Sequence, residues 1–170
     1  MAKTEVWLSG PVEGIAPELQ PFAHTLLQCR EDVEAHLTGL GSDLLWVRPG
    51  GAASIGFHVR HAAGALDRLF TYARGESLSP AQVAAAKAEG DPDPQPDASA
   101  RLAADFSRAI DAALEQLRQT DAARLLDPRA VGRAQLPSTV LGLLFHGAEH
   151  TQRHMGQMIT TIKVVTSKER

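Results

Sequence analysis

The sequence predicts an all-α protein, a four-helix bundle, on three observations. Alanine and leucine dominate the apolar residues, and only 5% of the 170 residues are aromatic, a composition that favours helix over strand. Apolar residues recur at spacings of three and four along several segments, as they do on the buried side of an amphipathic helix. The length is that of one domain, so we expect residues 1–170 to form a single bundle.

The first two expected helices occupy the N-terminal half. Residues 1–16 are expected to form an extended lead-in, and Pro17 suits the first turn of a helix. Gly39 ends this helix, whose buried side is predicted to carry Phe22, Leu26, Cys29, Val33, Leu37 and Leu40. After a connection broken by proline and glycine, Ser54 is placed to cap a second helix over residues 55–74.

Two further long helices and one short helix are expected in the C-terminal half. Ser79 begins the short extra helix, and residues 91–97 cannot be helical because proline recurs at every second position. Residues 99–119 are predicted to be helical, with Leu102, Phe106, Ile110, Ala113 and Leu117 facing inward. The pattern does not decide whether the loop over 120–137 contains a short hairpin. The last helix is expected over 139–165, and the long connections allow an order other than up-down-up-down.

Composition and charge argue against several classes of function. The formal net charge is −3, and no run rich in Lys and Arg occurs, so we expect no nucleic-acid partner. No run of about 18 apolar residues suggests a membrane span. The N-terminus lacks the features of a signal peptide, and the single cysteine cannot form a disulfide within the chain. We therefore expect a cytoplasmic protein with no membrane partner.

The last expected helix carries the clearest functional signal, a pair of histidines four residues apart. His150 and His154 point the same way from adjacent turns, and they continue the apolar line of Leu143, Gly147 and Met158. Two neutral imidazoles buried side by side need partners for their ring nitrogens. A divalent metal ion supplies one partner to each, so the pair predicts two ligands of a metal site.

A third ligand must come from another helix, and His61 on the second helix is the natural candidate. His58 lies about 60° around the same helix and is a possible fourth ligand, a proton carrier or a plain polar neighbour. His146 lies one turn before His150 and is a second possible additional ligand. The competing interpretation of any such histidine is a hydrogen-bonded core residue. That interpretation is favoured for His58 and His146, and strongly favoured for His24 and His36.

Two segments together resemble the DinB/YfiT-like metalloprotein superfamily. The first places a histidine, His61, seven residues after Ser54 in SIGFHVRHAAGALDRLFTYARGE. The second is a His-x-x-x-His-x-Gly-Gln run, His150 to Gln157, in HGAEHTQRHMGQM. The resemblance implies a four-helix bundle with an unusual helix order, a three-histidine site for zinc or nickel, and a homodimer. It also implies use of a low-molecular-weight thiol such as bacillithiol or mycothiol in some members.

The expected chemistry follows from the open coordination position that three imidazoles leave on a divalent ion. Such an ion would deprotonate a bound thiol. Together with the thiol use that the resemblance implies, this predicts a metal-dependent thiol S-transferase. The sequence names no catalytic side chain. Gln157 lies one turn beyond His154 and is a possible hydrogen-bond partner of a ligand imidazole or a bound water, with surface exposure as the alternative. Contact with an anionic thiol substrate is possible for Arg60, Arg68 and Arg153, but it is not favoured over a solvated surface position.

Other functions remain open at this stage. The same three histidines would serve a metal-dependent hydrolase of small substrates, with water in place of the thiol. A third possibility is a non-catalytic metal-binding stress protein. His146 to His150 also spells the His-x-x-Glu-His pattern of inverted zinc peptidases, but three fixed positions in a histidine-rich helix are weak support for a peptidase.

Overall fold

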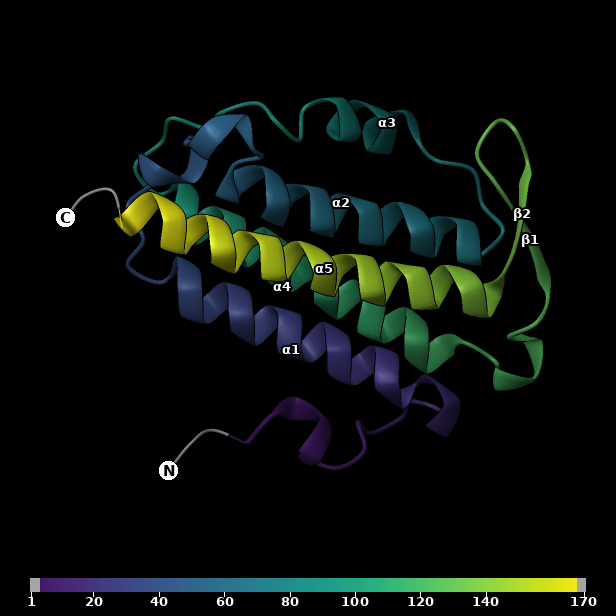
Figure 1. The fold of residues 1–170 in the computed structure, drawn as a ribbon. Helices are drawn as coiled ribbons and strands as arrows, with labels where there is room; N and C mark the ends of the chain where they lie inside the picture. Colours follow the sequence, from purple (N-terminus) through teal and green to yellow (C-terminus); the bar gives the residue numbers. More distant parts are fainter. Residues whose placement is uncertain (1–3, 168–170) are drawn as a thin grey trace.

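The structure is a computed structural model that describes residues 4–167, and it consists mainly of four long helices packed side by side (Figure 1). The predicted all-α fold is confirmed, with one short extra helix between the second and third long helices. The elements are α1 (Gln20–Leu37), α2 (Ile55–Ala73), α3 (Pro80–Lys87), α4 (Ala98–Gln119) and α5 (Val140–Ser167).

The order of the helices differs from a simple up-down bundle. α5 packs against both α1 and α2, and α4 packs against the same two helices. Helices that follow one another in sequence, α1 and α2, therefore occupy opposite corners. Figure 1 shows that α1 and α5 run in one direction while α2 and α4 run in the other. The contact between the antiparallel helices α2 and α5 is the most extensive in the bundle.

The start of α2 agrees with the capping residue predicted from the sequence. The Ser54 hydroxyl accepts a hydrogen bond from the backbone N–H of Phe57 at 3.2 Å. At the start of α3, Ser79 and Gln82 form a complete capping box, which satisfies backbone donors that the helix leaves unpaired. In the described part of the lead-in before Pro17, a 3-10 turn, Val6–Leu8, contacts α1. Residues 1–3 of the predicted lead-in lie outside the described residues.

A small hairpin connects α4 to α5 in the loop that the sequence left undecided. Strand β1 (Pro128–Val131) pairs antiparallel with β2 (Leu136–Thr139), and Pro128 lies opposite Thr139. Gln135 adopts a positive φ of 50° in the turn between them. Each short strand contains a proline, Pro128 in β1 and Pro137 in β2, and this weakens the strand pattern in the sequence because proline cannot donate to the ladder.

The core lies between the four long helices and is made of the predicted apolar stripes. Phe106, Ile110, Val33 and Leu26 are completely buried. All of the residues expected to face inward from α4 are buried, whereas Leu40, beyond the end of α1, is only partly buried. Within residues 4–167, no helix is both long and apolar enough to cross a membrane.

Gly147 allows α5 to approach α2 closely. A Cβ atom at this position would lie 2.9 Å from Cε2 of Phe70 and 3.3 Å from Cδ1 of Leu66. Both neighbouring side chains are buried in the core, so a larger residue at position 147 would push the two helices apart. The absence of a side chain here therefore sets the spacing of the helix pair that carries the three predicted metal ligands.

We expect Gly147→Val to destabilise the metal-free protein by roughly 1–3 kcal/mol through overpacking. The matched control is Gly156→Val on the same helix, because a Cβ at Gly156 would have no atom within 4 Å. Urea unfolding monitored by circular dichroism measures the two free energies of unfolding. Equal values for the two variants would show that the α2–α5 contact does not require a glycine.

Candidate metal centre

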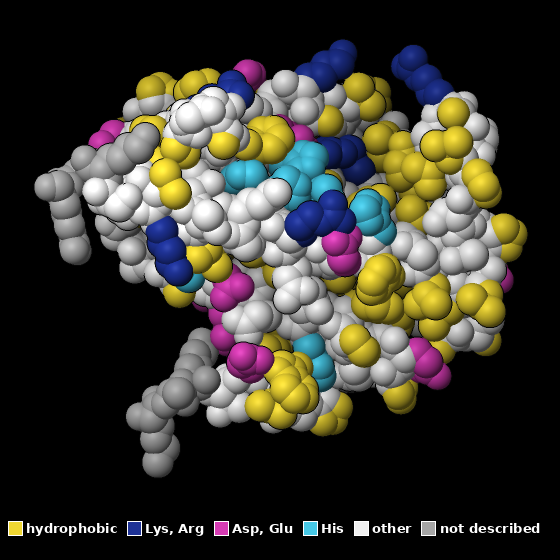
Figure 2. All heavy atoms as spheres, in the orientation of Figure 1, with side chains coloured by type: hydrophobic (Ala, Val, Ile, Leu, Met, Phe, Trp, Pro, Cys, Tyr) yellow, Lys and Arg dark blue, Asp and Glu magenta, His cyan; other side chains and the backbone are white. Residues whose placement is uncertain are grey.

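The three histidines predicted as ligands lie together between α2 and α5. Each of His61, His150 and His154 offers one ring nitrogen, and these nitrogens lie within 4.8 Å of one another. All three side chains are partly buried. Figure 2 shows histidine side chains gathered at the surface, with acidic and basic side chains beside them. One side of the site is therefore covered by protein, and the other side faces solvent.

Helical geometry explains how the rings converge. The centroids of the His150 and His154 rings are 4.6 Å apart, as the four-residue spacing on one helix predicts. His61 approaches from α2, with its ring 4.6 Å from that of His154 and 5.1 Å from that of His150. Its Nε2 atom lies 3.0 Å from Nε2 of His150. Neighbouring helices thus direct three imidazoles toward one point.

Glu89 is a partner of His61 that the sequence analysis missed. Its Oε2 atom lies 2.7 Å from Nδ1 of His61, and its Oε1 atom accepts a hydrogen bond from Arg68 at 2.7 Å. Glu89 is only 6% exposed, and the Arg68 side chain is 15% exposed. The interpretation of Arg68 as a solvated residue is therefore wrong. The only sequence signal for Glu89 is that it is the single acidic residue between Ser77 and Gly90.

His58 lies behind the cluster of three and contacts His154. The two Nδ1 atoms are 3.0 Å apart, so one ring can donate a hydrogen bond to the other when both are neutral. His58 is 6% exposed. The Phe57 ring stacks on His61 at 5.2 Å between centroids and 9° between planes. His58 therefore lies as a polar neighbour of His154, outside the group of three.

The remaining sequence candidates lie away from this point or at its margin. The His146 side chain is 51% exposed and approaches Glu149 at 3.4 Å. His24 contacts the Gly10 carbonyl through Nε2, and His36 contacts the Asp32 carbonyl through Nδ1. These three histidines thus have local partners and do not belong to the group that faces a common centre.

Two polar residues of the last helix face outward. Gln157 is exposed, and no hydrogen bond joins it to the histidines in the part of the chain that the structure describes. Arg153 is exposed and forms an ion pair with Glu149, in agreement with its interpretation as a surface residue. The side chain of Gln157 therefore takes the surface position, which was one of its two predicted alternatives.

Burial favours the neutral form of the two imidazoles on α5. Burial is the largest of the causes that lower the pKa of His154 to about 4, and the nearby rings of His61, His150 and His58 contribute to this shift. Burial also lowers the pKa values of His58 and His150. A neutral imidazole has a free lone pair for a metal, so His150 and His154 are ready to ligate at neutral pH.

Comparison with known proteins identifies the family. A family model described as the DinB superfamily matches residues 25–158. The chain belongs to the DinB superfamily. The matched region contains all three histidines of the cluster and Glu89, and most of the four long helices.

The DinB fold is also seen in a solved relative. The crystal structure of a DinB-like protein from Bacillus cereus ATCC 10987 superimposes with a TM-score of 0.62 at 17% sequence identity. The match covers 85% of this chain and 91% of that one. At this identity the likeness supports the fold alone. No curated protein matches the chain.

The residues of this DinB-superfamily site fit a divalent metal ion. The nearest donors are imidazole nitrogens, which suit ions such as zinc and nickel. The Nδ1 atom of His150 is buried and has no hydrogen-bond partner within residues 4–167, although buried polar atoms usually have one. His61 already directs Nδ1 at a carboxylate, which leaves Nε2 for a ligand role.

We expect purified protein to contain about one divalent ion per chain, and His150→Ala or His154→Ala to lose it. His61→Ala should weaken binding, while the control His24→Ala should bind like wild type because His24 contacts only Gly10. Elemental analysis and titration with a competing chelator measure these effects. Undiminished metal in both α5 variants would exclude this site, and equal losses in His61→Ala and His24→Ala would exclude His61.

We also expect the metal-free protein to lose stability as pH falls below about 6.5. The folded-state pKa of His154 is about 4, below its ordinary value of 6.5, so the unfolded chain takes up protons first. The contribution of neutral His154 to the free energy of unfolding is present above pH 6.5 and is lost as pH falls toward 4. Urea unfolding at several pH values should show a shallower loss for His154→Gln than for wild type. If the free energies of unfolding of the two proteins fall in parallel with pH, the loss does not come from His154.

Proposed function

We propose that this DinB-superfamily chain binds one divalent ion, zinc or nickel, at His61, His150 and His154, and uses it to activate a low-molecular-weight thiol. The observation that carries the proposal is the convergence of three imidazoles, His61, His150 and His154, on a partly exposed point. Three protein ligands leave a position for an exchangeable group, which is typical of catalytic rather than structural sites.

The ion would supply a lowered pKa for a bound thiol, so that the thiolate form is available at neutral pH. The reaction would form a bond from the thiol sulfur to an electrophilic carbon while the leaving group departs with its electron pair. The proton of the thiol passes to solvent. The protein's own residues would hold the ion, shield one side of the reacting sulfur with the buried face of the cluster, and leave the other side open to substrate.

The single cysteine is not available to serve as the nucleophile. Cys29 is fully buried on α1, and burial, with a smaller effect of Asp32, raises the pKa of its thiol to about 12. A thiol with that pKa is almost wholly protonated at neutral pH. A nucleophilic sulfur would therefore have to come from a small molecule, which supports the transferase over a mechanism through the chain's own thiol.

We expect conjugation of a small thiol to an activated aryl halide to require both the thiol and the metal. The assay uses zinc- or nickel-loaded protein with cysteine, bacillithiol or mycothiol, with and without a chelator. His154→Ala should be inactive, and Cys29→Ala should retain activity because Cys29 is buried away from the cluster.

Two outcomes would contradict the transferase. Hydrolysis of a small activated ester that needs metal but no thiol would indicate the hydrolase that the same ligands could serve. Stoichiometric metal without turnover of either substrate class would indicate a non-catalytic metal-binding protein. The homodimer expected from the family resemblance and the cytoplasmic location stay predictions.

A further inference from the structure

Glu89 is a buried acidic residue that lies outside the four long helices. It follows the short helix α3 and lies over α2, where its two oxygens contact His61 and Arg68 at 2.7 Å each. A buried carboxylate is costly unless it is paired and hydrogen-bonded. Here the Arg68 guanidinium offsets the charge. The other carboxylate oxygen accepts a hydrogen bond from the Nδ1–H of His61.

The surface of α2 is shaped to receive this carboxylate. His61, Gly64 and Arg68 follow one another at spacings of three and four, so they share one face of the helix. A Cβ atom at Gly64 would lie 2.7 Å from Oε1 of Glu89 and 2.8 Å from Nη1 of Arg68. The missing side chain of Gly64 therefore provides the space that the carboxylate occupies.

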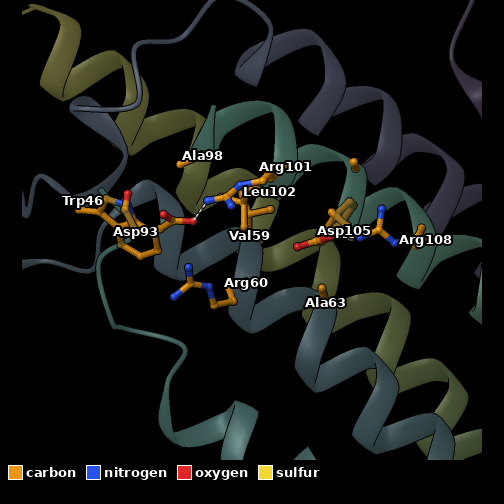
Figure 3. A pocket seen from close by; sticks show the side chains of 12 residues that line it. Trp46, Val59, Arg60, Ala63, Asp93, Ala98, Arg101, Leu102, Asp105 and Arg108 are labelled. Atoms are coloured by element: carbon orange, nitrogen blue, oxygen red, sulfur yellow. Dashed lines mark hydrogen bonds and ion pairs between the residues drawn. The ribbon is translucent and has the colours of Figure 1, made fainter. Parts of the chain in front are cut away.

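The chain segment that carries Glu89, Ala88–Asp93, is attached to the bundle beyond this contact. Arg60 donates hydrogen bonds to the carbonyls of Ala88 at 3.1 Å and Asp91 at 2.6 Å. The Trp46 indole donates to the Asp93 carbonyl at 3.1 Å, and the Arg60 guanidinium lies 4.5 Å from the Trp46 ring centroid. Figure 3 shows Arg60 near Trp46, and the Asp93 side chain paired with Arg101.

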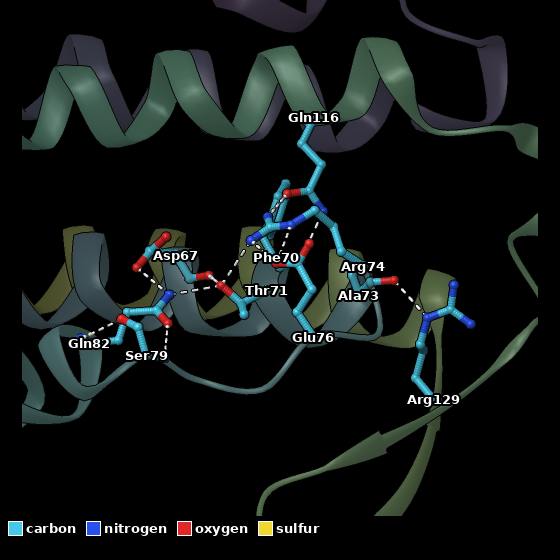
Figure 4. A network of polar contacts seen from close by, with 10 residues as sticks. All are labelled: Asp67, Phe70, Thr71, Ala73, Arg74, Glu76, Ser79, Gln82, Gln116 and Arg129. Carbon is cyan, nitrogen blue, oxygen red and sulfur yellow. Dashed lines mark hydrogen bonds and ion pairs between the residues drawn. The ribbon is translucent and has the colours of Figure 1, made fainter.

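The N-terminal end of α3 is also hydrogen-bonded to α2. The Gln82 side chain donates to Asp67 at 2.7 Å and to the Thr71 hydroxyl at 2.8 Å (Figure 4). α3 itself has no buried residue, so little apolar packing holds it against the bundle. The polar contacts at its two ends, rather than a hydrophobic face, determine where Glu89 lies.

We propose that Glu89 is a positioning residue for the metal ligand His61, held in place by the segment Ala88–Asp93. Glu89 accepts the Nδ1 proton of His61, which keeps the lone pair on Nε2 facing His150 and His154. Phe57, stacked on the ring at 5.2 Å, fixes the ring plane, and Glu89 fixes the tautomer and the rotation within that plane. A carboxylate in this place raises the basicity of the ligand nitrogen. The inference rests on the proposed metal site.

Glu89→Gln tests the charge and the tautomer with little change of shape. We expect zinc affinity, measured by competition with a chromophoric chelator, to fall about 10- to 100-fold while saturation still gives one ion per chain. The matched control is Glu149→Gln, which removes a carboxylate beside His150 that pairs with Arg153. This control should retain the wild-type affinity within a few-fold.

Gly64→Ala tests the same contact while both charges remain. Its Cβ would displace the carboxylate, while alanine has a higher helix propensity than glycine, so the variant should fold. We expect its zinc affinity to fall, and we expect no further fall when Gly64→Ala is added to Glu89→Gln, because both changes remove one interaction.

Nitrogen NMR of the histidine rings in the metal-free protein provides a readout independent of metal and activity. We expect His61, assigned with His61→Gln, to be the Nδ1–H tautomer in wild type and a mixture of tautomers in Glu89→Gln, since an amide can donate as well as accept. Urea unfolding of each variant identifies any that is not folded.

The outcomes separate the two proposals. A wild-type protein that binds neither zinc nor nickel would overturn the proposed function, whereas the tautomer measurement would still test the Glu89 contact. Wild-type zinc binding with unchanged affinity and tautomer in folded Glu89→Gln would overturn the role of Glu89 alone. Equal losses of affinity in Glu89→Gln and Glu149→Gln would indicate a general effect of charge and would also overturn it.

Discussion

The candidate site depends on the close packing of α2 against α5. Imidazoles are short side chains, so rings on two helices can share one point only if the backbones approach closely. Gly147 makes this possible, because its missing side chain lets α5 pack against Phe70 and Leu66 of α2. The next turns of the same pair of helices carry His150 and His154 on one side and His61 on the other. The spacing of the core therefore sets the geometry of the polar site.

The polar side of the helix pair is organised around one buried carboxylate. Glu89 joins Arg68 and His61, while the neighbouring imidazoles have pKa values lowered mainly by burial. The result is a group of three imidazoles with a carboxylate behind one of them. That arrangement suits a divalent cation, because imidazole nitrogens bind the ion and the carboxylate orients one imidazole from the outer layer of the site.

The helical positions and most of the candidate ligands could be predicted from the sequence because both depend on local periodicity. A spacing of four puts His150 and His154 on one face of any α-helix, and the apolar line through Leu143 and Met158 indicates which face is inward. The choice of His61 as the third ligand depended on recognising a second helix with its own apolar face. The structure confirms the helical bundle, and the three rings do lie together.

The sequence by itself therefore determined the helices, the cap of α2 and the faces that carry the histidines. Only the tertiary structure decided that Glu89 and Arg68 complete the polar group, that His58 lies behind His154 and that Gln157 faces solvent. Glu89 is separated from His61 by 28 positions and follows a helix with no buried residue, so no periodicity points to it. Its position results from hydrogen bonds between distant segments, and such contacts arise only when the connections between the helices have been placed.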